Sequence, residues 1–487
     1  MKTLLEPKTD IHHRPLSDGW RMTLLLAFLL GAGPASAQGA NPRLLTTFTN
    51  PTPAFFELFG GSVAAMGTDR VLISAGAAAG GGKVFLFNLN GTLLTTFTNP
   101  GTAGNGFGGL GGERGLAAMG TDRVLIGAFD SYRGEPLEQI GAAFLFSTNG
   151  TLLTTFTNPN PAKVQAFGWS LAAVGNDRVI ISGLANINKP PPYPGGVYLF
   201  TTNGTLLTTF TNPTPAIHGE FGVSLAVIEG NRVLIGASSV GPVGAGVAYL
   251  FSTNGALLTT ITNPVPAEGI NFGTAVAVVG SDRLLISATD AAATKGNGGS
   301  AYLFTTNGTL LATFPNPTPA ANDLFGWSVA AVGSSRVIIG ASQDGAGALR
   351  SGAAYVFSTN GTLLATITNP TPAVNDYFGW AVAAVGSDEV IIGSVWKDLG
   401  ATDAGAAYLF ALSNPSLSIA RNATMISLSW VTPESSWVLQ QLDLPGPTTL
   451  WSDNTNAVIV SGPTNIVQQE LDTSNRIFRL HLPRSGF

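Results

Sequence analysis

Four carboxylates stand shortly before recurring Phe-Gly pairs, and their type and placement suggest acid–base chemistry. Glu57, Glu220, Asp323 and Asp376 each lie one or two residues upstream of such a pair. Two carboxyl groups about 5–10 Å apart in one pocket are the usual catalytic pair of glycoside hydrolases. The same residues also suit short polar turns, and the sequence favours that role. We therefore keep a polysaccharide-active enzyme as an alternative and assign no catalytic residue.

Other catalytic groups are scarce. The chain has no cysteine, which excludes a disulfide framework, a thiolate metal site and a cysteine nucleophile. Of its four histidines, only His218 and His481 lie outside the N-terminal segment, too few for a histidine-rich metal site. The formal net charge is −5, so the chain lacks the excess of positive charge that is typical of nucleic-acid-binding proteins. We predict neither a metal nor a cofactor.

The secondary-structure elements that would hold a functional site are encoded by an internal sequence repeat. A Phe-Gly pair recurs at 59, 107, 167, 221, 272, 325 and 378. Each repeat holds four short runs, clearest as Ser-Val-Ala-Ala-Val (A), Arg-Val-Ile-Ile-Gly (B), Ala-Ala-Tyr-Val-Phe (C) and Thr-Leu-Leu-Ala-Thr-Ile-Thr (D) within residues 328–368. These residue types favour strands, and Asn-Gly between C and D is typical of a tight hairpin.

Four-stranded units at this period predict a β-propeller. The last repeat has no D run, whereas an unassigned D run, residues 44–51, precedes the first Phe-Gly pair. Pairing of this run with the segment around Tyr408 would complete a seventh blade and remove the free edge of an open array. We therefore predict an all-β fold, with a seven-bladed propeller over residues 43–412 that is closed by an N-terminal strand.

The phrases Phe-Gly-x-Ser-Val, Arg-Val-Ile-Ile-Gly-Ala and Gly-Ala-Ala-Tyr-Val-Phe resemble the FG-GAP repeat of integrin α-subunit propellers. This resemblance covers about residues 43–412 and implies that Phe325 and its counterparts pack between blades, while Gly326 permits close backbone approach. Many FG-GAP repeats carry Asp-rich calcium loops between their first two strands. Residues 66–70, 174–178 and 385–389 offer only one or two carboxylates there, too few for calcium, so the chain resembles a calcium-free exported bacterial variant.

The two ends of the chain read differently from the repeats. Residues 1–37 combine a charged segment, an apolar run at 22–30 and a terminal Ala-Ser-Ala, the pattern of a secretory signal peptide. We expect a secreted or cell-envelope protein without a transmembrane anchor after cleavage, and a monomer. Residues 413–487 contain short alternating runs that predict a small β-sandwich, and they resemble the fibronectin type III-like modules of secreted bacterial proteins.

Loop variability indicates where a ligand would bind. In a propeller, the B–C and D–A connections share one face, and here their length and composition vary most. Aromatic and basic side chains in variable loops are typical binding residues, and the candidates are Tyr132, Arg133, Tyr193, Trp396 and Lys397. We therefore expect a non-enzymatic binding or adhesion propeller for a glycan or protein partner. A purely structural envelope component is a further alternative.

Overall fold

The computed structural model describes most of the repeat region and parts of the tail. The described residues are 42–77, 81–101, 106–109, 115–129, 141–185, 195–214, 220–238, 245–267, 269–290, 298–413, 418–421, 425–431, 438–444, 452–454, 456, 458–461, 464–470 and 475–481. The predicted signal peptide lies outside them. In these ranges no helix has the length and apolarity needed to cross a membrane.

Seven antiparallel sheets follow the repeats, and we number them as blades. Blade 1 holds β2 (Phe59–Met66), β3 (Arg70–Ala75), β4 (Lys83–Asn88) and β5 (Leu93–Thr98); blade 2 holds β6 (Leu116–Met119), β7 (Arg123–Ala128), β8 (Ala142–Ser147) and β9 (Leu152–Thr157). Blade 3 holds β10 (Val164–Gln165), β11 (Leu171–Val174), β12 (Arg178–Ala185), β13 (Gly196–Thr201) and β14 (Leu206–Thr211). Blade 4 holds β15 (Phe221–Ile228), β16 (Arg232–Ala237), β17 (Val247–Ser252) and β18 (Leu257–Thr262).

The remaining blades keep the same order. Blade 5 holds β19 (Ile270–Val279), β20 (Arg283–Asp290), β21 (Ser300–Thr305) and β22 (Leu310–Pro315). Blade 6 holds β23 (Phe325–Val332), β24 (Arg336–Ala341), β25 (Ala353–Ser358) and β26 (Leu363–Thr368). Blade 7 holds β27 (Phe378–Val385), β28 (Glu389–Ser394), β29 (Ala406–Ala411) and β1 (Arg43–Thr49).

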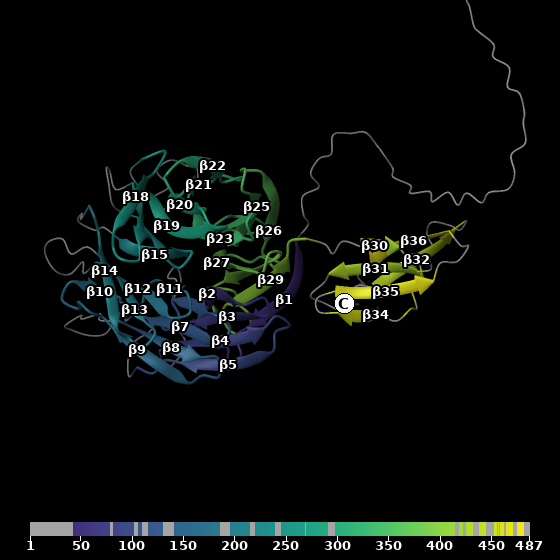
Figure 1. Cartoon of the computed structure of the whole chain (residues 1–487), viewed down its shortest axis with the longest axis horizontal. Coiled ribbons are helices and arrows are strands. Elements are labelled where there is room, and N and C mark those ends of the chain that lie inside the picture. Colours follow the sequence, from purple (N-terminus) through teal and green to yellow (C-terminus); the bar gives the residue numbers. More distant parts are fainter. Residues whose placement is uncertain are drawn as a thin grey trace, which may run out of the picture. The chain divides into compact units, whose positions relative to one another are not determined.

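The innermost strands of the blades form a closed cycle. Contacts run from β2 to β6, β11, β15, β19, β23 and β27, and from β27 back to β2 (Figure 1). In the described part of the chain, each of the seven junctions is filled by an apolar cluster drawn from two adjacent blades. The prediction of an all-β, seven-bladed propeller is confirmed.

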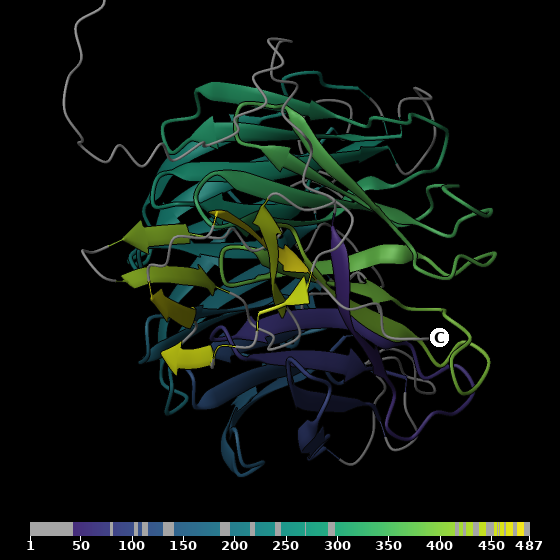
Figure 2. The ribbon, with the colours of Figure 1, turned by 90° about the vertical axis from the view of Figure 1, so that its right-hand side faces the viewer.

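Strand β1 lies at the outer edge of blade 7, distant in sequence from its neighbours. It is antiparallel to β29, with Thr47 opposite Tyr408 (Figure 2). The Thr46 hydroxyl donates to the carbonyl of Leu89 in blade 1 at 2.6 Å. The Thr95 hydroxyl makes the equivalent bond to Thr148 at 2.7 Å, from blade 1 to blade 2. The N-terminal strand therefore makes the same inter-blade contact as a D strand of an internal repeat.

The Phe-Gly pairs lock neighbouring blades together. Phe325 is fully buried in the cluster between blades 5 and 6, as the resemblance implied. Gly326 has a φ of +89°, and a Cβ there would lie 2.9 Å from the Ser287 Cβ of blade 5. Only glycine accepts both this backbone conformation and this approach without strain. The recurring pair is thus a packing device, which accounts for its presence in every blade.

The outer D strands carry a bulge that exposes leucine. In blade 1, Leu93 is opposite Phe87 and Thr95 is opposite Leu86, so Leu94 has no partner across the ladder. An unpaired residue interrupts the alternation of side chains, so two successive leucines are left exposed. The exposed fraction of the leucines at these positions lies between 38% and 50%. They are Leu44, Leu93, Leu94, Leu152, Leu153, Leu206, Leu207, Leu257, Leu258, Leu310, Leu311 and Leu363.

The tail contains two further antiparallel sheets. One has the order β30 (Ser418–Arg421), β31 (Met425–Val431), β35 (Thr464–Glu470) and β34 (Val458–Ser461). The other has the order β33 (Ser452–Asp453), β32 (Val438–Leu444) and β36 (Asn475–His481). Leu428 and Val467 of the first sheet and Leu439 of the second share one buried cluster. The two sheets therefore pack on each other through apolar side chains.

Candidate functional site

The B–C and D–A loops form one face of the ring because they hydrogen-bond to one another. The amide of Phe56 donates to the carbonyl of Thr402 at 3.1 Å, and that of Gln343 donates to the carbonyl of Asp323 at 3.1 Å. Each of these bonds joins a loop between blades to a loop within a blade. Backbone pairing of this kind holds loop side chains on a rigid base, which suits recognition.

Three of the five predicted ligand contacts, Tyr132, Arg133 and Tyr193, lie outside the described residues. The other two are adjacent in the B–C loop of blade 7. Trp396 is half-buried, and its ring packs edge-on against Tyr377 with centroids 4.6 Å apart. Lys397 is only 8% exposed. The two neighbours therefore have different roles.

Lys397 is part of the protein's own framework. Its ammonium group donates to the backbone carbonyl of Thr371 at 2.6 Å and to Oδ2 of Asp376 at 3.0 Å, and both side chains of this ion pair are buried. Removal of either partner would leave a buried charge uncompensated. The prediction of Lys397 as a ligand contact is corrected: its charge is already used in holding the loop.

A strip of aromatic rings crosses this face. We define the aromatic strip as Phe55, Phe56, Trp396, Tyr377, Trp380 and Trp327. Consecutive ring centroids lie 6.1, 6.4, 4.6, 5.7 and 5.1 Å apart. Phe55 is 74% exposed and Phe56 is 44% exposed, whereas Tyr377 is buried. The strip thus runs from solvent inward and joins blades 1, 7 and 6.

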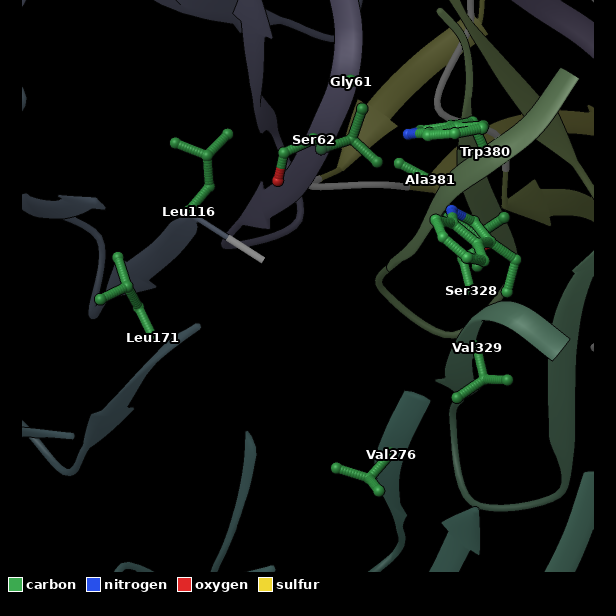
Figure 3. A pocket seen from close by; sticks show the side chains of 12 residues that line it. Gly61, Ser62, Leu116, Leu171, Val276, Ser328, Val329, Trp380 and Ala381 are labelled. Atoms are coloured by element: carbon green, nitrogen blue, oxygen red, sulfur yellow. The ribbon is translucent and has the colours of Figure 1, made fainter. Parts of the chain in front are cut away.

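The inner end of the strip borders a cavity of about 170 Å³ at the centre of the ring. Figure 3 shows Leu116, Leu171, Val276 and Val329 around this space, with Trp380 at its side. Most of these residues come from equivalent positions of different blades. Ser62 and Ser328 also line the cavity, so its wall combines aliphatic side chains with hydroxyl groups.

The carboxylates proposed for acid–base work serve their own loops instead. Oε2 of Glu57 accepts hydrogen bonds from the Asn50 side chain at 2.5 Å and from the amide of Ala54 at 3.2 Å. Asp323 and Asp376 repeat this pattern with an upstream Asn side chain and a loop amide. Glu220 is exposed and accepts from the Ser238 hydroxyl. The structural role that the sequence favoured is confirmed for the three buried carboxylates.

The B–C loop of blade 6, which hydrogen-bonds to the D–A loop of Asp323, holds a second acid. Oδ2 of Asp344, which is 4% exposed, accepts from the hydroxyl groups of Tyr355 at 2.5 Å and Thr318 at 2.9 Å. Burial raises the pKa of Asp323 above its ordinary value, and the nearby charge of Asp344 raises it further. Burial likewise raises the pKa of Tyr408 to about 12, so the phenol in blade 7 stays neutral at physiological pH.

The strip contains residues that were not predicted as contacts, although part of the signal is visible in the sequence. A tryptophan follows the Phe-Gly pair at Trp169, Trp327 and Trp380, where other repeats have Gly, Val or Thr. In the described residues no three His, Cys, Asp or Glu side chains come together as a metal site would require. The aromatic strip is therefore the candidate site on this face.

Comparison with known protein families gives a match for two segments of the repeat region. The FG-GAP repeat family model matches residues 318–357 and 362–410. No curated protein matches the chain.

Two solved structures are similar to this chain. The WD40 β-propeller domain of Doa1 has a TM-score of 0.48 and 14% sequence identity, covering 76% of this chain and 97% of that one. A structure from a mechanistic analysis of two prolyl endopeptidases has a TM-score of 0.45 and 14% identity, covering 79% of this chain and 55% of that one. Residues 318–357 and 362–410 are therefore FG-GAP repeats, and they contribute to blades 6 and 7 of a seven-bladed β-propeller.

Proposed function

We propose that this protein is an exported, non-enzymatic binding propeller that takes a protein or glycan partner on the aromatic strip. The observation that carries the proposal is the exposure of Phe55 and Phe56 at the outer end of a continuous row of rings. Such side chains expose apolar surface to water unless something covers them. Aromatic residues on a rigid base also dominate the energetics of most interfaces.

Trp396 stays in the proposal as the central contact of the strip. It links the exposed Phe56 to the buried Tyr377, so its ring is held in place while part of its surface remains accessible. Tyr132, Arg133 and Tyr193 remain proposed contacts from other loops of the same face. The proposal of export rests on the signal-peptide pattern of residues 1–37.

Two finer features of the fold belong to this proposal. The N-terminal strand would close the ring of the exported protein, and the pairing of Thr47 with Tyr408 supports this. Residues 413–487 would form a small β-sandwich similar to fibronectin type III-like modules. Packing of Leu428 and Leu439 from two different sheets into one cluster supports a sandwich.

The test is a binding measurement on residues 38–487. The wild-type protein is screened on a glycan array and against surface proteins of the source cell, and any ligand is then titrated against variants. Phe55→Ser with Phe56→Ser, and Trp396→Ala alone, should each weaken binding at least tenfold. Val265→Ser, at another exposed apolar residue in a D–A loop, is the matched control and should bind as the wild type does.

Either partner class satisfies the proposal, and the screen tells them apart. Equal affinity in the wild type and in both strip variants, measured with a confirmed ligand, would remove the strip as the site. Equal weakening by Val265→Ser would show a general loss of structure, which circular dichroism of the same samples would reveal.

A further inference from the structure

The central cavity has room for one small ring, and no charged group lines it. Its volume is about 170 Å³. Apolar cavities of about 150 Å³ hold one six-membered ring such as benzene. Among the described residues, no acidic, basic or histidine side chain belongs to the wall. A charged group placed here would lose its hydration without gaining a counter-charge. The cavity therefore suits one uncharged ring.

Aliphatic side chains from several blades supply much of the wall. In blades 1, 3, 5, 6 and 7 the cavity is lined by the fourth residue after the phenylalanine of the Phe-Gly pair. These residues are Val63, Leu171, Val276, Val329 and Val382. They pack against C–H groups and offer no hydrogen bond. A ring that fits here must therefore present apolar faces, as ligands of mostly apolar pockets do.

Two tryptophans make one side of the wall aromatic. Trp327 and Trp380 occupy the same position in blades 6 and 7, two residues after the phenylalanine, whereas blade 1 has Gly61 there. Their ring centroids lie 5.1 Å apart, and their planes are tilted by 50°. The face of an indole ring is a large, flat apolar surface. A ligand ring would therefore pack one face against this side of the cavity.

The same two tryptophans carry hydrogen-bond donors that the protein leaves unused. Among the described residues, the indole nitrogens of Trp327 and Trp380 are buried and have no hydrogen-bond partner. A buried donor without an acceptor is unfavourable, and such groups are rare in folded proteins. Figure 3 shows the Trp380 ring with its nitrogen toward the side of the cavity where Ser62 lies. An oxygen atom of a ligand would supply the missing acceptor.

The wall also offers a hydrogen-bond acceptor. The Ser328 hydroxyl donates its proton to the backbone carbonyl of Gly379 at 2.9 Å. Its oxygen keeps lone pairs, so Ser328 can accept a hydrogen bond from a group in the cavity. Ser62 of blade 1 contributes a further hydroxyl-bearing residue to the wall. Polar groups therefore come from blades 1, 6 and 7, around an otherwise apolar space.

These features together favour a sugar over other uncharged rings. A neutral pyranose has apolar C–H faces, and its edge carries hydroxyl groups that both donate and accept hydrogen bonds. A phenylalanine or leucine side chain of a protein partner would leave the indole N–H groups unpaired. A tyrosine side chain has a single hydroxyl, which cannot serve polar groups from three blades.

We propose that the central cavity binds the terminal sugar of a neutral glycan. One face of the sugar packs on Trp380, and its hydroxyl groups bond to the indole N–H groups and to Ser328. The inference rests on the proposed function, because the rest of the glycan would run outward along the aromatic strip to Phe56. Both indole nitrogens are covered by protein atoms, so a small rotation of each ring accompanies binding, and tryptophan fluorescence reports it.

The test is a titration of residues 38–487 with small sugars. The probes are the methyl glycosides of glucose, galactose, mannose and N-acetylglucosamine, measured by tryptophan fluorescence and by isothermal titration. At least one should bind, with one site per chain. Methyl glucuronide should not bind, because its carboxylate would be buried without a counter-charge. Phenol, which has the ring and hydroxyl of a tyrosine side chain, is the probe for a protein partner.

Three variants separate the cavity from the rest of the fold. Trp380→Phe keeps a ring but removes the N–H group, and it should weaken sugar binding at least fivefold. Val276→Phe fills the cavity and should abolish binding. Trp169→Phe is the matched control: Trp169 follows a Phe-Gly pair and its nitrogen also lacks a partner, but it does not line the cavity. This control should bind as the wild type does. If Val276→Phe does not fold, as judged by circular dichroism, Trp380→Phe still decides the question.

The outcomes distinguish this inference from the proposed function. Absence of binding by every glycoside, binding of phenol alone, or equal sugar affinity in wild type and Trp380→Phe would overturn the inference. If the Phe55→Ser, Phe56→Ser double variant then still loses a confirmed protein ligand, the proposed function stands without it. Conversely, sugar binding that is lost in Val276→Phe, together with a full ligand that ignores the changes at Phe55, Phe56 and Trp396, would keep the cavity and remove the outer strip.

Discussion

The backbone of Phe59 forms a parallel bridge with Gly405, although the two residues stand near opposite ends of the repeat array. The Phe59 amide donates to the carbonyl of Ala404 at 2.9 Å. The same parallel bridge joins Gly352 to Phe378 between blades 6 and 7. The first and last blades are therefore joined by the same backbone contact as two consecutive blades.

This contact makes the inner glycines sensitive to any side chain. A Cβ on Gly393 would lie 2.1 Å from the carbonyl oxygen of Gly60, and backbone cannot move aside easily. Gly393→Ala should lower the free energy of unfolding by about 1–3 kcal/mol, the usual range for overpacking. Urea unfolding followed by circular dichroism measures it. Gly345→Ala, where nothing lies within 4 Å of the added Cβ, should change stability little; equal losses would contradict the explanation.

Closure through the N-terminal strand predicts a large effect of one buried ring. Phe48 of β1 is 1% exposed and lies 5.4 Å from Phe87 of blade 1, measured between ring centroids. Phe48→Ala should cost about 3–5 kcal/mol of stability, as truncations of buried aromatics do. Leu44→Ala, on the same strand but 38% exposed, is the control. A Phe48→Ala variant as stable as the control would mean that β1 does not hold the ring closed.

The buried ion pair of blade 7 predicts a non-additive response. Lys397→Met should destabilise the fold by about 3–5 kcal/mol, because Asp376 remains charged and buried without its partner. Asp376→Asn added to this variant should recover part of the loss. Lys163→Met, at an exposed lysine, is the control. Thermal and urea unfolding of the wild type, Lys397→Met, Asp376→Asn and the double variant complete the cycle, and simple additivity would argue against a coupled pair.

Asp323 predicts a specific pH dependence of stability. Burial and the charge of Asp344 hold its folded-state pKa above the ordinary 3.8. The folded state therefore binds this proton more tightly than the unfolded state, so the stabilisation is greatest below pH 3.8 and is lost as pH rises through the folded pKa. Asp323→Asn should gain stability relative to wild type as pH rises through this window. Asp69→Asn, at an exposed carboxylate, is the control for removal of an acid.

Much of the scaffold could be predicted because the repeats share the same short sequence motifs. The Phe-Gly pairs and the β-branched runs recur in all seven copies and the Asn-Gly turns in six, so local and global preferences coincide. The strand positions and the number of blades follow from counting these phrases. Burial of Phe325 follows as well, since an aromatic ring repeated at one position of every blade must pack against its neighbours.

The candidate site was harder to predict because single residues depart from the repeat. From the sequence alone, Lys397 is expected to be an exposed basic residue in a loop. Only the position of Asp376 in the structure shows that the charge of Lys397 is paired inside the protein. The aromatic strip joins Phe55 to Trp327 through contacts between blades, so no local pattern reveals it. Comparison of equivalent loop positions, such as Asp344 with Lys397, is the sequence signal that could have drawn attention to both.

The exposed leucine pairs of the outer strands have a consequence for engineering. Because the bulge recurs from blade to blade, similar exposed apolar patches lie around the periphery of the ring. Replacement of the exposed leucines in one blade leaves those of the other blades in place. Solubility will therefore change only when the leucines of many blades are replaced together. The repetition of the outer strands therefore lets the protein tolerate single substitutions there, and it also limits what a single substitution can do for solubility.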